Sequence, residues 1–364
     1  MRRLLRNRFF VLATISLIAC SADNVLGQPQ SFEALASSKF GSASRFWIAE
    51  PGDTSLNRWD PRELFEDVGV VLEWDSQNIV VVRSGAKRET TTPGDYVIRI
   101  EPSWANESGE KIHRLFSGRQ YTPVVKEGSA VVNKATTSGL PRWQLRVILS
   151  EMVESCSALG KPHIAGTVFT SLAKENPPQL LLATIPIPWG EMAMSEVDLS
   201  KIQPLSEGWI TQDSEALQLL GASWLLSGTR RSFAIETLEQ LSKNAKSPLI
   251  NAYARAQLWR TVPPAEILSD RYPKWLADRD KLLLPLQAGP TMLLAERLSQ
   301  AGQPNLAIPE WLRIATMHGD RYHLAIKAIA KASEALRVAG RKEEADRVML
   351  MLERYKIEKN RNEP

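Results

Sequence analysis

Residues 149–177 read LSEMVESCSALGKPHIAGTVFTSLAKENP and carry the clearest helical pattern in the chain. Before Gly160, apolar side chains recur at the spacing of one helical face: Leu149, Met152, Val153, Cys156 and Leu159. A second such face follows the glycine: Ala165, Val168, Phe169 and Leu172. Gly160 breaks the first helix, Pro162 suits the first turn of the second, and Pro177 ends it. The stretch therefore predicts two antiparallel amphipathic helices.

The spacing of four residues in this stretch resembles the second half of a tetratricopeptide repeat: Gly160, Ala165, Phe169 and Pro177. In that family the small residues let two helices approach, the aromatic ring fills the groove, and the proline separates repeats. Two later stretches, LSQAGQPNLA at 298–307 and LRVAGRKEEA at 336–345, align with each other at an offset of 38. Each has a glycine followed five residues later by an alanine: Gly302 and Ala307, then Gly340 and Ala345. The resemblance implies a solenoid of helical hairpins.

Other parts of the helical region fit this pattern less well. Gly228 is followed by Ala234 at six residues, and Gly118 by Pro123 where the small residue belongs. Pro309 falls inside an expected second helix, which must kink there or start later. We therefore expect helical hairpins over 109–177, a helical repeat domain over 213–356, and a charged tail over 357–364. Between the two helical parts, the proline-rich residues 178–212 are either a connector that packs across the array or a boundary between subdomains.

Residues 45–108 have a strand pattern instead. The runs VGVVLEW, NIVVVRS and DYVIRIE are rich in β-branched and aromatic residues, and turn-forming residues such as Thr92-Pro93-Gly94-Asp95 separate them. Together with Phe46-Trp47-Ile48 they predict a small antiparallel β-domain of four or five strands, which resembles an SH3-like or Sm-like barrel. The predicted fold class is therefore α+β, mainly α, with this β-domain followed by a tetratricopeptide-like α-solenoid.

The first 27 residues predict export. MRRLLRNR followed by FFVLATISLIA is a charged region and then an apolar one of eleven residues, the layout of a secretory signal and too short for a permanent membrane span. Leu17-Ile18-Ala19-Cys20 resembles the lipobox of bacterial lipoproteins, which implies cleavage before Cys20 and its lipidation. Ordinary cleavage after Ala22 or Gly27 remains open. Residues 28–44 are small and polar and predict a flexible linker.

Composition limits the classes of function. The chain is 43% hydrophobic and 24% charged, a soluble globular balance. Its net charge of +4 comes from Arg2, Arg3, Arg6 and Arg8 of the signal, so the mature chain is neutral and does not fit nucleic-acid binding. Because the signal removes or acylates Cys20, the mature chain keeps only Cys156 and can form no internal disulfide.

Catalytic and metal motifs are lacking in the sequence. Cys156 lies seven residues before His163, but its place on an apolar helical face favours core packing over a nucleophile or metal ligand. His318 and His323 straddle an expected helix start, and neither HExxH nor paired CxxC occurs. Phosphate-binding glycine loops and the GxSxG elbow are also missing from the chain. We expect no catalytic residues, no metal and no cofactor.

The predicted function is a non-catalytic interaction or assembly scaffold of the bacterial cell envelope. Its expected partners are other envelope proteins or peptides, with membrane contact only through a lipid anchor at Cys20; the overall layout also resembles that of exported bacterial proteins. Trp143 and Trp189 stand in loop-like surroundings, where an exposed ring can contact a partner or a glycan. The alternatives are an envelope hydrolase acting on cell wall or polysaccharide, and a glycan-binding protein.

Overall fold

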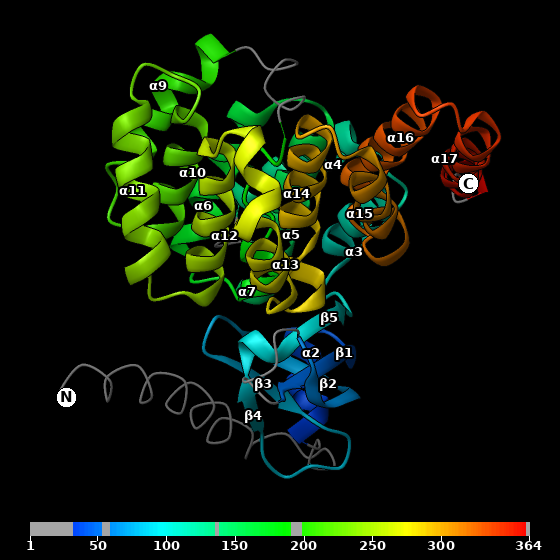
Figure 1. Ribbon diagram of the computed structural model, residues 1–364. Helices are drawn as coiled ribbons and strands as arrows, with labels where there is room; N and C mark the ends of the chain where they lie inside the picture. The colour runs from blue at the N-terminus through cyan, green and yellow to red at the C-terminus, as the bar shows by residue number, and fades with distance from the viewer. Residues whose placement is uncertain (1–31, 53–58, 135–137, 191–198, 362–364) are drawn as a thin grey trace, which may run out of the picture.

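The structure is a computed structural model that describes residues 32–52, 59–134, 138–190 and 199–361. Figure 1 shows a small sheet at one end of a larger body of helices. All the strands of this described part precede the first long helix, α3 (Glu107–Ser117). The prediction of a mainly helical chain with a small antiparallel sheet on its N-terminal side is therefore confirmed.

The sheet has five antiparallel strands in the order β4-β3-β2-β1-β5. They are β1 (Ser44–Pro51), β2 (Pro61–Trp74), β3 (Asn78–Val82), β4 (Thr90–Pro93) and β5 (Val97–Glu101). The long strand β2 pairs with β1 through its first half and with β3 through its second half, and a register shift lies between Val71 and Glu73. A short 3₁₀ turn, η1 (Gly94–Tyr96), joins β4 to β5. The inward-facing residues Phe46, Ile48 and Trp74 are fully buried.

The predicted flexible linker over 28–44 is wrong for residues 32–40, which form helix α2 (Phe32–Phe40). Ala36 of α2 packs against Val70 and Val82 of the sheet, and these three side chains form a small core of their own. Contact with apolar positions of the sheet thus orders a segment whose small, polar composition carries little helical signal. Residues 28–31 lie outside the described residues, as do the signal and Cys20.

Helices make up most of the described residues after the sheet. They are α3, α4 (Tyr121–Val132), α5 (Arg142–Ala158), α6 (Pro162–Lys174), α7 (Gln179–Leu182), α9 (Leu199–Trp209), α10 (Glu215–Leu225), α11 (Arg231–Asn244), α12 (Pro248–Leu258), α13 (Tyr272–Asp280), α14 (Ala288–Gln300), α15 (Pro304–Met317), α16 (Tyr322–Val338) and α17 (Lys342–Arg361). Neighbours in sequence pack against each other, and alternate helices also touch at α3 and α5, α10 and α12, and α14 and α16. α15 starts at Pro304 and runs through Pro309, while α17 continues past the expected end of the helical domain at 356.

Three hairpins turn in the same way. Gly160, Gly302 and Gly340 have φ angles of 67°, 72° and 76°, and each follows the last turn of a helix. In each case the N–H of the next residue donates to a carbonyl five residues earlier, from Lys161 to Cys156, from Gln303 to Leu298 and from Arg341 to Leu336, at 2.9 Å. This is the Schellman arrangement. It favours glycine at the turn residue, because that residue needs a positive φ angle. Ala165, Ala307 and Ala345 then lie fully buried against the preceding helix.

A fourth hairpin, between α3 and α4, turns at Arg119 rather than at Gly118. Arg119 has a φ of 61°, and the N–H of Gln120 donates to the Leu115 carbonyl at 2.9 Å, as in the other three turns. Val124, five residues after Arg119, is fully buried at the position that alanine occupies elsewhere. The repeat pattern in the sequence predicts this turn at Gly118, one residue too early, because the pattern assigns the turn position to glycine.

The described part of 178–212 packs across the helices. α7 is followed by a turn at Ala183-Thr184 and a segment without regular secondary structure, residues 185–189, and after an undescribed stretch by α9, which contains Pro204. Ile185, Ile187 and Trp189 of this connector belong to one hydrophobic core that extends from Leu149 to Val348. Among the helices that the structure describes, none is both long and apolar enough to cross a membrane.

Candidate functional site

The connector forms one wall of a pocket in the helical body. The pocket encloses ≈ 120 Å³ and lies among the end of α5, the start of α6, α12, α14 and the start of α16. Most of its lining is apolar or aromatic: Pro162, Ile185, Pro186, Ile187, Pro188, Trp189, Trp224, Tyr253, Pro285, Met292 and Leu324. The charged lining residues are Glu154, Glu296, Arg321, His323 and Lys327. An apolar cavity with a few convergent polar groups is the usual form of a binding site.

Helix side chains hold the connector in place by its main chain. The Trp224 Nε1–H donates to the carbonyl of Pro186 at 2.8 Å, and the Gln257 Nε2–H donates to that of Pro188 at 3.1 Å. The Trp189 ring meets Tyr253 edge to face, with centroids 4.8 Å apart. The Tyr253 hydroxyl in turn donates to the Leu286 carbonyl at 2.9 Å. The Pro186 and Pro188 carbonyls and the Tyr253 hydroxyl thus already have hydrogen-bond partners within the protein.

Gly289 lets Trp189 approach α14 closely. A Cβ at Gly289 would lie 2.2 Å from the Trp189 ring, far inside van der Waals contact. Burial of a large aromatic residue against a helix needs such a gap in the helix surface. Glycine at this position therefore serves packing, and it fixes where Trp189 stands in the pocket wall.

An ionic cluster closes the polar side of the pocket. Glu154 of α5 forms an ion pair with Arg321 at the start of α16, and its Oε2 lies 3.2 Å from His323 Nδ1. The Glu154 and Arg321 side chains are each only 13% exposed. Burial alone raises the pKa of Glu154, but the charges and hydrogen bonds of Arg321 and His323 outweigh it and lower this pKa to about 2. The carboxylate is therefore ionised throughout the physiological range.

The same contact brings distant parts of the chain together. Besides the Glu154 pair, the Arg119 guanidinium lies over the Tyr322 ring, 3.7 Å from its centroid. Both contacts join the first helical hairpins to the start of α16, so the array of helices curves back on itself. The pocket exists at this point because α5 and α16 meet there with the connector between them.

The expectation of an exposed loop tryptophan is wrong at position 143. Trp143 lies in α5, whose first residue follows Pro141, and it is fully buried. Its Nε1–H donates to the carbonyl of Val71 in β2 at 2.9 Å. Trp143 therefore ties the helices to the sheet and offers no surface to a partner. Trp189 does lie outside the helices, but it is only 9% exposed, so contact with a partner is limited to the pocket that it lines.

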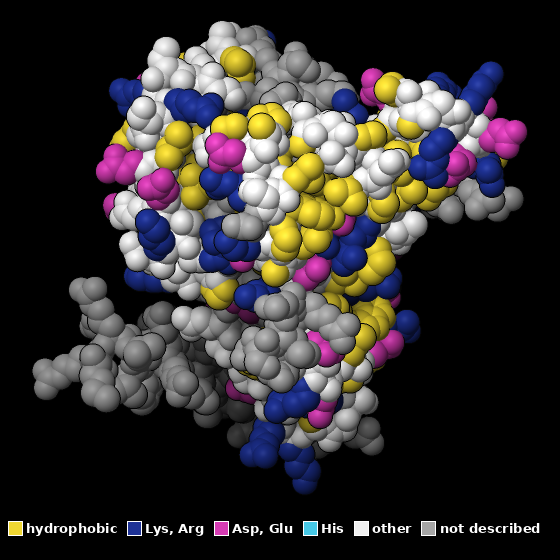
Figure 2. Space-filling view, viewed as in Figure 1, with side chains coloured by type: hydrophobic (Ala, Val, Ile, Leu, Met, Phe, Trp, Pro, Cys, Tyr) yellow, Lys and Arg dark blue, Asp and Glu magenta, His cyan; other side chains and the backbone are white. Residues whose placement is uncertain are grey.

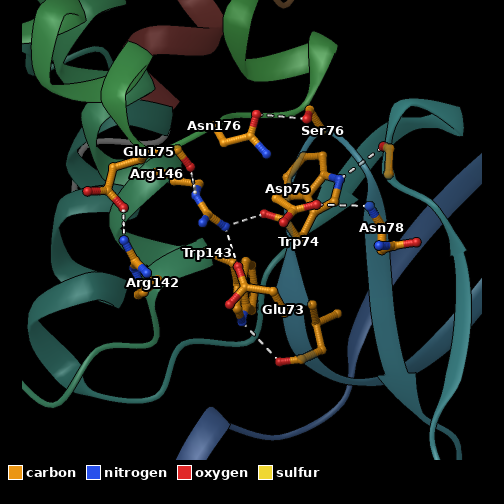
Figure 3. A network of polar contacts seen from close by, with 12 residues as sticks. Glu73, Trp74, Asp75, Ser76, Asn78, Arg142, Trp143, Arg146, Glu175 and Asn176 are labelled. Atoms are coloured by element: carbon orange, nitrogen blue, oxygen red, sulfur yellow. Dashed lines mark hydrogen bonds and ion pairs between the residues drawn. The ribbon is translucent and has the colours of Figure 1, made fainter. Parts of the chain in front are cut away.

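Arg146 is the centre of this junction between the sheet and the helices, as Figure 3 shows. Its guanidinium forms an ion pair with Glu73 and donates to the Trp74 carbonyl at 2.6 Å and to the Glu175 carbonyl at 2.8 Å. The Arg146 side chain is 5% exposed. A second tie lies nearby, where the Ser76 hydroxyl donates to Asn176 Oδ1 at 2.9 Å. The two units share polar contacts and an apolar core that includes Trp143 and Leu181.

The cysteine and histidines of the sequence do not form a reactive group. Cys156 is 1% exposed, and burial raises the pKa of its thiol to about 11, so it stays protonated. His163 is half-buried on the other side of the turn, whereas His318 is buried and its pKa falls to about 4 because of that burial. Within the described ranges, no cluster of three or more His, Cys, Asp or Glu side chains could hold a metal ion.

The pocket does gather residue types that occur in hydrolases. Glu154, Glu296, Ser157 and His323 all line it. Glu154, however, is held ionised by Arg321, so it cannot donate a proton near neutral pH. The Ser157 hydroxyl donates to the Val153 carbonyl of its own helix at 2.9 Å.

Sequence reasoning found the hairpin at Gly160 but missed the residues that shape the pocket. Glu154 and Arg321 are 167 positions apart, and Gln257 is 69 positions from the carbonyl that it binds. No local spacing links such residues. The only signal was the proline content of the connector, which is too high for a continuous helix. Comparison of the chain with protein-family models, curated proteins and solved structures finds no match in any of the three.

Proposed function

We propose that this protein is a non-catalytic interaction or assembly protein of the bacterial cell envelope. In this proposal it is exported through its first 27 residues and is anchored to a membrane where Cys20 is lipidated. Other envelope proteins or peptides are its partners, and the pocket beside the connector is where they bind.

One observation carries this proposal: the helices hold a non-helical segment of polypeptide between them. Residues 185–189 have no regular secondary structure, and side chains of α10 and α12 donate hydrogen bonds to the carbonyls of Pro186 and Pro188. Side chains that bond to the main chain of a non-helical segment can hold a peptide in the same way. The open space next to the connector can receive a further segment in the same manner.

The finer features of the fold support the same use. Four hairpins share one turn geometry, which suits a tetratricopeptide-like array, and such arrays present concave binding surfaces. The strand order β4-β3-β2-β1-β5 with one long shared strand suits an SH3-like or Sm-like barrel. A fold alone does not determine function, so the pocket is the feature that ties this function to particular residues.

The test is site-specific photo-crosslinking in cells followed by affinity purification from the membrane fraction. A crosslinking amino acid replaces Leu324, which lines the pocket, or Phe233, which is exposed on α11 outside it. We expect a reproducible crosslinked product of one size from position 324 and not from position 233. Recovery of no product from position 324 in repeated experiments would overturn the proposal.

A hydrolase is the second candidate, because Glu154, Glu296, Ser157 and His323 converge on the pocket. It predicts that the purified full chain releases soluble products from peptidoglycan or envelope polysaccharide. It also predicts that Glu296→Gln abolishes this release while the protein stays folded. If the wild-type protein turns over neither peptidoglycan nor envelope polysaccharide, the hydrolase candidate is excluded. Trp143 does not support the glycan-binding alternative, because its ring is buried and cannot contact a glycan.

A further inference from the structure

The two proline residues of the connector present no free hydrogen-bonding group to the pocket. Pro186 and Pro188 carry no N–H, and their carbonyls already accept hydrogen bonds from Trp224 and Gln257. The nearby Tyr253 hydroxyl is also engaged, with the Leu286 carbonyl. A polar group that entered this part of the pocket would lose its hydrogen bonds to water without replacement. The wall therefore selects an apolar group.

The charged lining residues have partners of their own. Glu154 is shared by Arg321 and His323, and Glu296 and Lys327 also have partners. A ligand with a net charge would therefore find its counter-charge already occupied, while its own desolvation remains unfavourable. The group that enters is thus uncharged as well as apolar.

The volume of the pocket is close to that needed for one small hydrocarbon ring. The pocket encloses ≈ 120 Å³. A dry apolar cavity of about 150 Å³ holds one benzene molecule. A side chain such as that of leucine, proline or phenylalanine matches this space, whereas a folded element does not.

From these observations we infer that the pocket receives one uncharged apolar side chain, of proline, leucine or phenylalanine size, from an extended segment of a partner polypeptide. This inference rests on the proposed function and names the chemistry of the partner's anchor.

The experiment follows the ε-methyl group of Met292, which lines the pocket, by ¹³C-methyl NMR in the full chain. The probes are three capped peptides, acetyl-Ala-Pro-Xaa-Pro-Ala-amide, in which Xaa is leucine, aspartate or lysine. We expect the leucine peptide to shift the Met292 signal in a saturable way, with at least about tenfold weaker binding of the two charged peptides, which corresponds to about 1.4 kcal/mol. A charged peptide that binds as tightly as the leucine peptide, or a leucine peptide that leaves the Met292 signal unchanged, overturns the inference.

Two matched variants locate the effect. Leu324 in α16 lines the pocket, and Leu312 in α15 lies outside it; both are half-buried. Leu324→Trp fills the pocket and should weaken the leucine peptide at least about tenfold, whereas Leu312→Trp should leave its affinity unchanged. If Leu324→Trp does not fold, the peptide series on the wild-type chain decides alone.

The outcomes separate this inference from the proposed function. Crosslinking at position 324 without binding of the leucine peptide would leave the interaction role standing and remove the apolar anchor. Binding of the leucine peptide without any crosslinked partner would keep the anchor chemistry and remove the proposed role in the envelope.

Discussion

Glu154 is a carboxylate that the tertiary structure keeps ionised. It lies on α5 with 13% of its side chain exposed, and its two neighbours Arg321 and His323 come from the start of α16. In the unfolded chain these neighbours are far away, so the carboxylate there has its ordinary pKa near 4.5. The difference between the two states makes Glu154 a link between pH and stability.

We predict that acid destabilises the protein partly through Glu154. Its pKa in the folded protein is lowered to about 2, so its contribution is fully present above pH 4.5 and is lost as the pH falls from 4.5 toward 2. A shift of this size corresponds to roughly 3 kcal/mol. Urea unfolding at a series of pH values measures it: the wild type should lose stability over this range, and Glu154→Gln should show a flatter profile.

The Glu154→Gln variant should also be less stable than the wild type near pH 7, by about 3–5 kcal/mol, because Arg321 is left buried without its counter-charge. Glu334→Gln is the matched control: Glu334 is 68% exposed and pairs only with Lys331 on its own helix. This control should stay within about 0.5 kcal/mol of the wild type. Equal effects of the two substitutions would contradict the role assigned to Glu154.

At the residue scale, sequence reasoning succeeded where local spacing decided the outcome and failed where tertiary contact did. Cys156 and Ala165 are buried as their helical periodicity predicts. Trp143 was misplaced because the preceding Pro141 suggested a loop, yet a proline just before a helix is common. Its burial depends on Val71, 72 positions earlier in the sequence, which no local pattern reports.

Helix ends are the elements that repeat most closely in this molecule. Gly302 has a φ of 72°, and no atom lies within 4 Å of where a Cβ would stand. Any effect of a side chain there is therefore a backbone effect. Arg119 adopts the same conformation without being glycine, with a φ of 61°, and its guanidinium lies over Tyr322.

We predict that both turns favour glycine over alanine. Gly302→Ala should destabilise the protein by about 1 kcal/mol, because a left-handed conformation is unfavourable for alanine. At position 119 both Ala and Gly remove the guanidinium, so their comparison isolates the backbone, and Arg119→Gly should be more stable than Arg119→Ala by about 1 kcal/mol. Thermal unfolding of the three variants measures these differences. If Arg119→Ala were the more stable of the pair, the assignment of Arg119 as the turn residue would be wrong.

A second element-scale prediction concerns the connector. Gly289→Ala places a Cβ 2.2 Å from the Trp189 ring and should destabilise the protein by about 1–3 kcal/mol. Gly208→Ala in α9 is the matched control: no atom lies within 4 Å of its Cβ position. Alanine favours helix there, so stability should rise by up to about 1 kcal/mol. Denaturant unfolding followed by tryptophan fluorescence measures the stability of both variants. A Gly289→Ala protein as stable as the wild type would contradict the packing of Trp189 on α14.

At the element scale, the sequence predicted the strands and hairpins better than the segments between them. The strand runs and the turn at Gly160 follow from period and turn chemistry, which are local. α2 was missed because its order comes from packing on Val70 and Val82. The first α-hairpin was misaligned by one residue because Arg119 supplies the positive φ that the pattern assigns to glycine.

The whole molecule joins two units that differ in period and in exposed surface. In the view of Figure 2, hydrophobic side chains gather over the middle of the helical body, whereas Lys, Arg, Asp and Glu are spread over its edges and over the sheet. The sheet meets the helices through Trp143 and Arg146 of α5, and also at the Trp59 N–H, which donates to the Asp280 carbonyl after α13. Two separate parts of the helical body therefore hold the sheet. None of these contacts is readable from the sequence, because each joins residues far apart in the chain.

The last prediction concerns this junction. Arg146→Ala removes three hydrogen-bond partners at once and leaves the Trp74 and Glu175 carbonyls without their donor. Because the Arg146 guanidinium and the Trp74 carbonyl are buried, the loss should be about 3–5 kcal/mol and should fall on the contact between the units rather than on either core. Arg142→Ala is the control, since Arg142 lies one turn earlier on α5, is 70% exposed and pairs only with Glu175. In Arg146→Ala, backbone amides of β2 and β3 should exchange faster, while those of α14 to α16 should keep their protection. Arg142→Ala should exchange like the wild type. Uniformly faster exchange across both units would mean that Arg146 stabilises the fold as a whole and is not a local tie between sheet and helices.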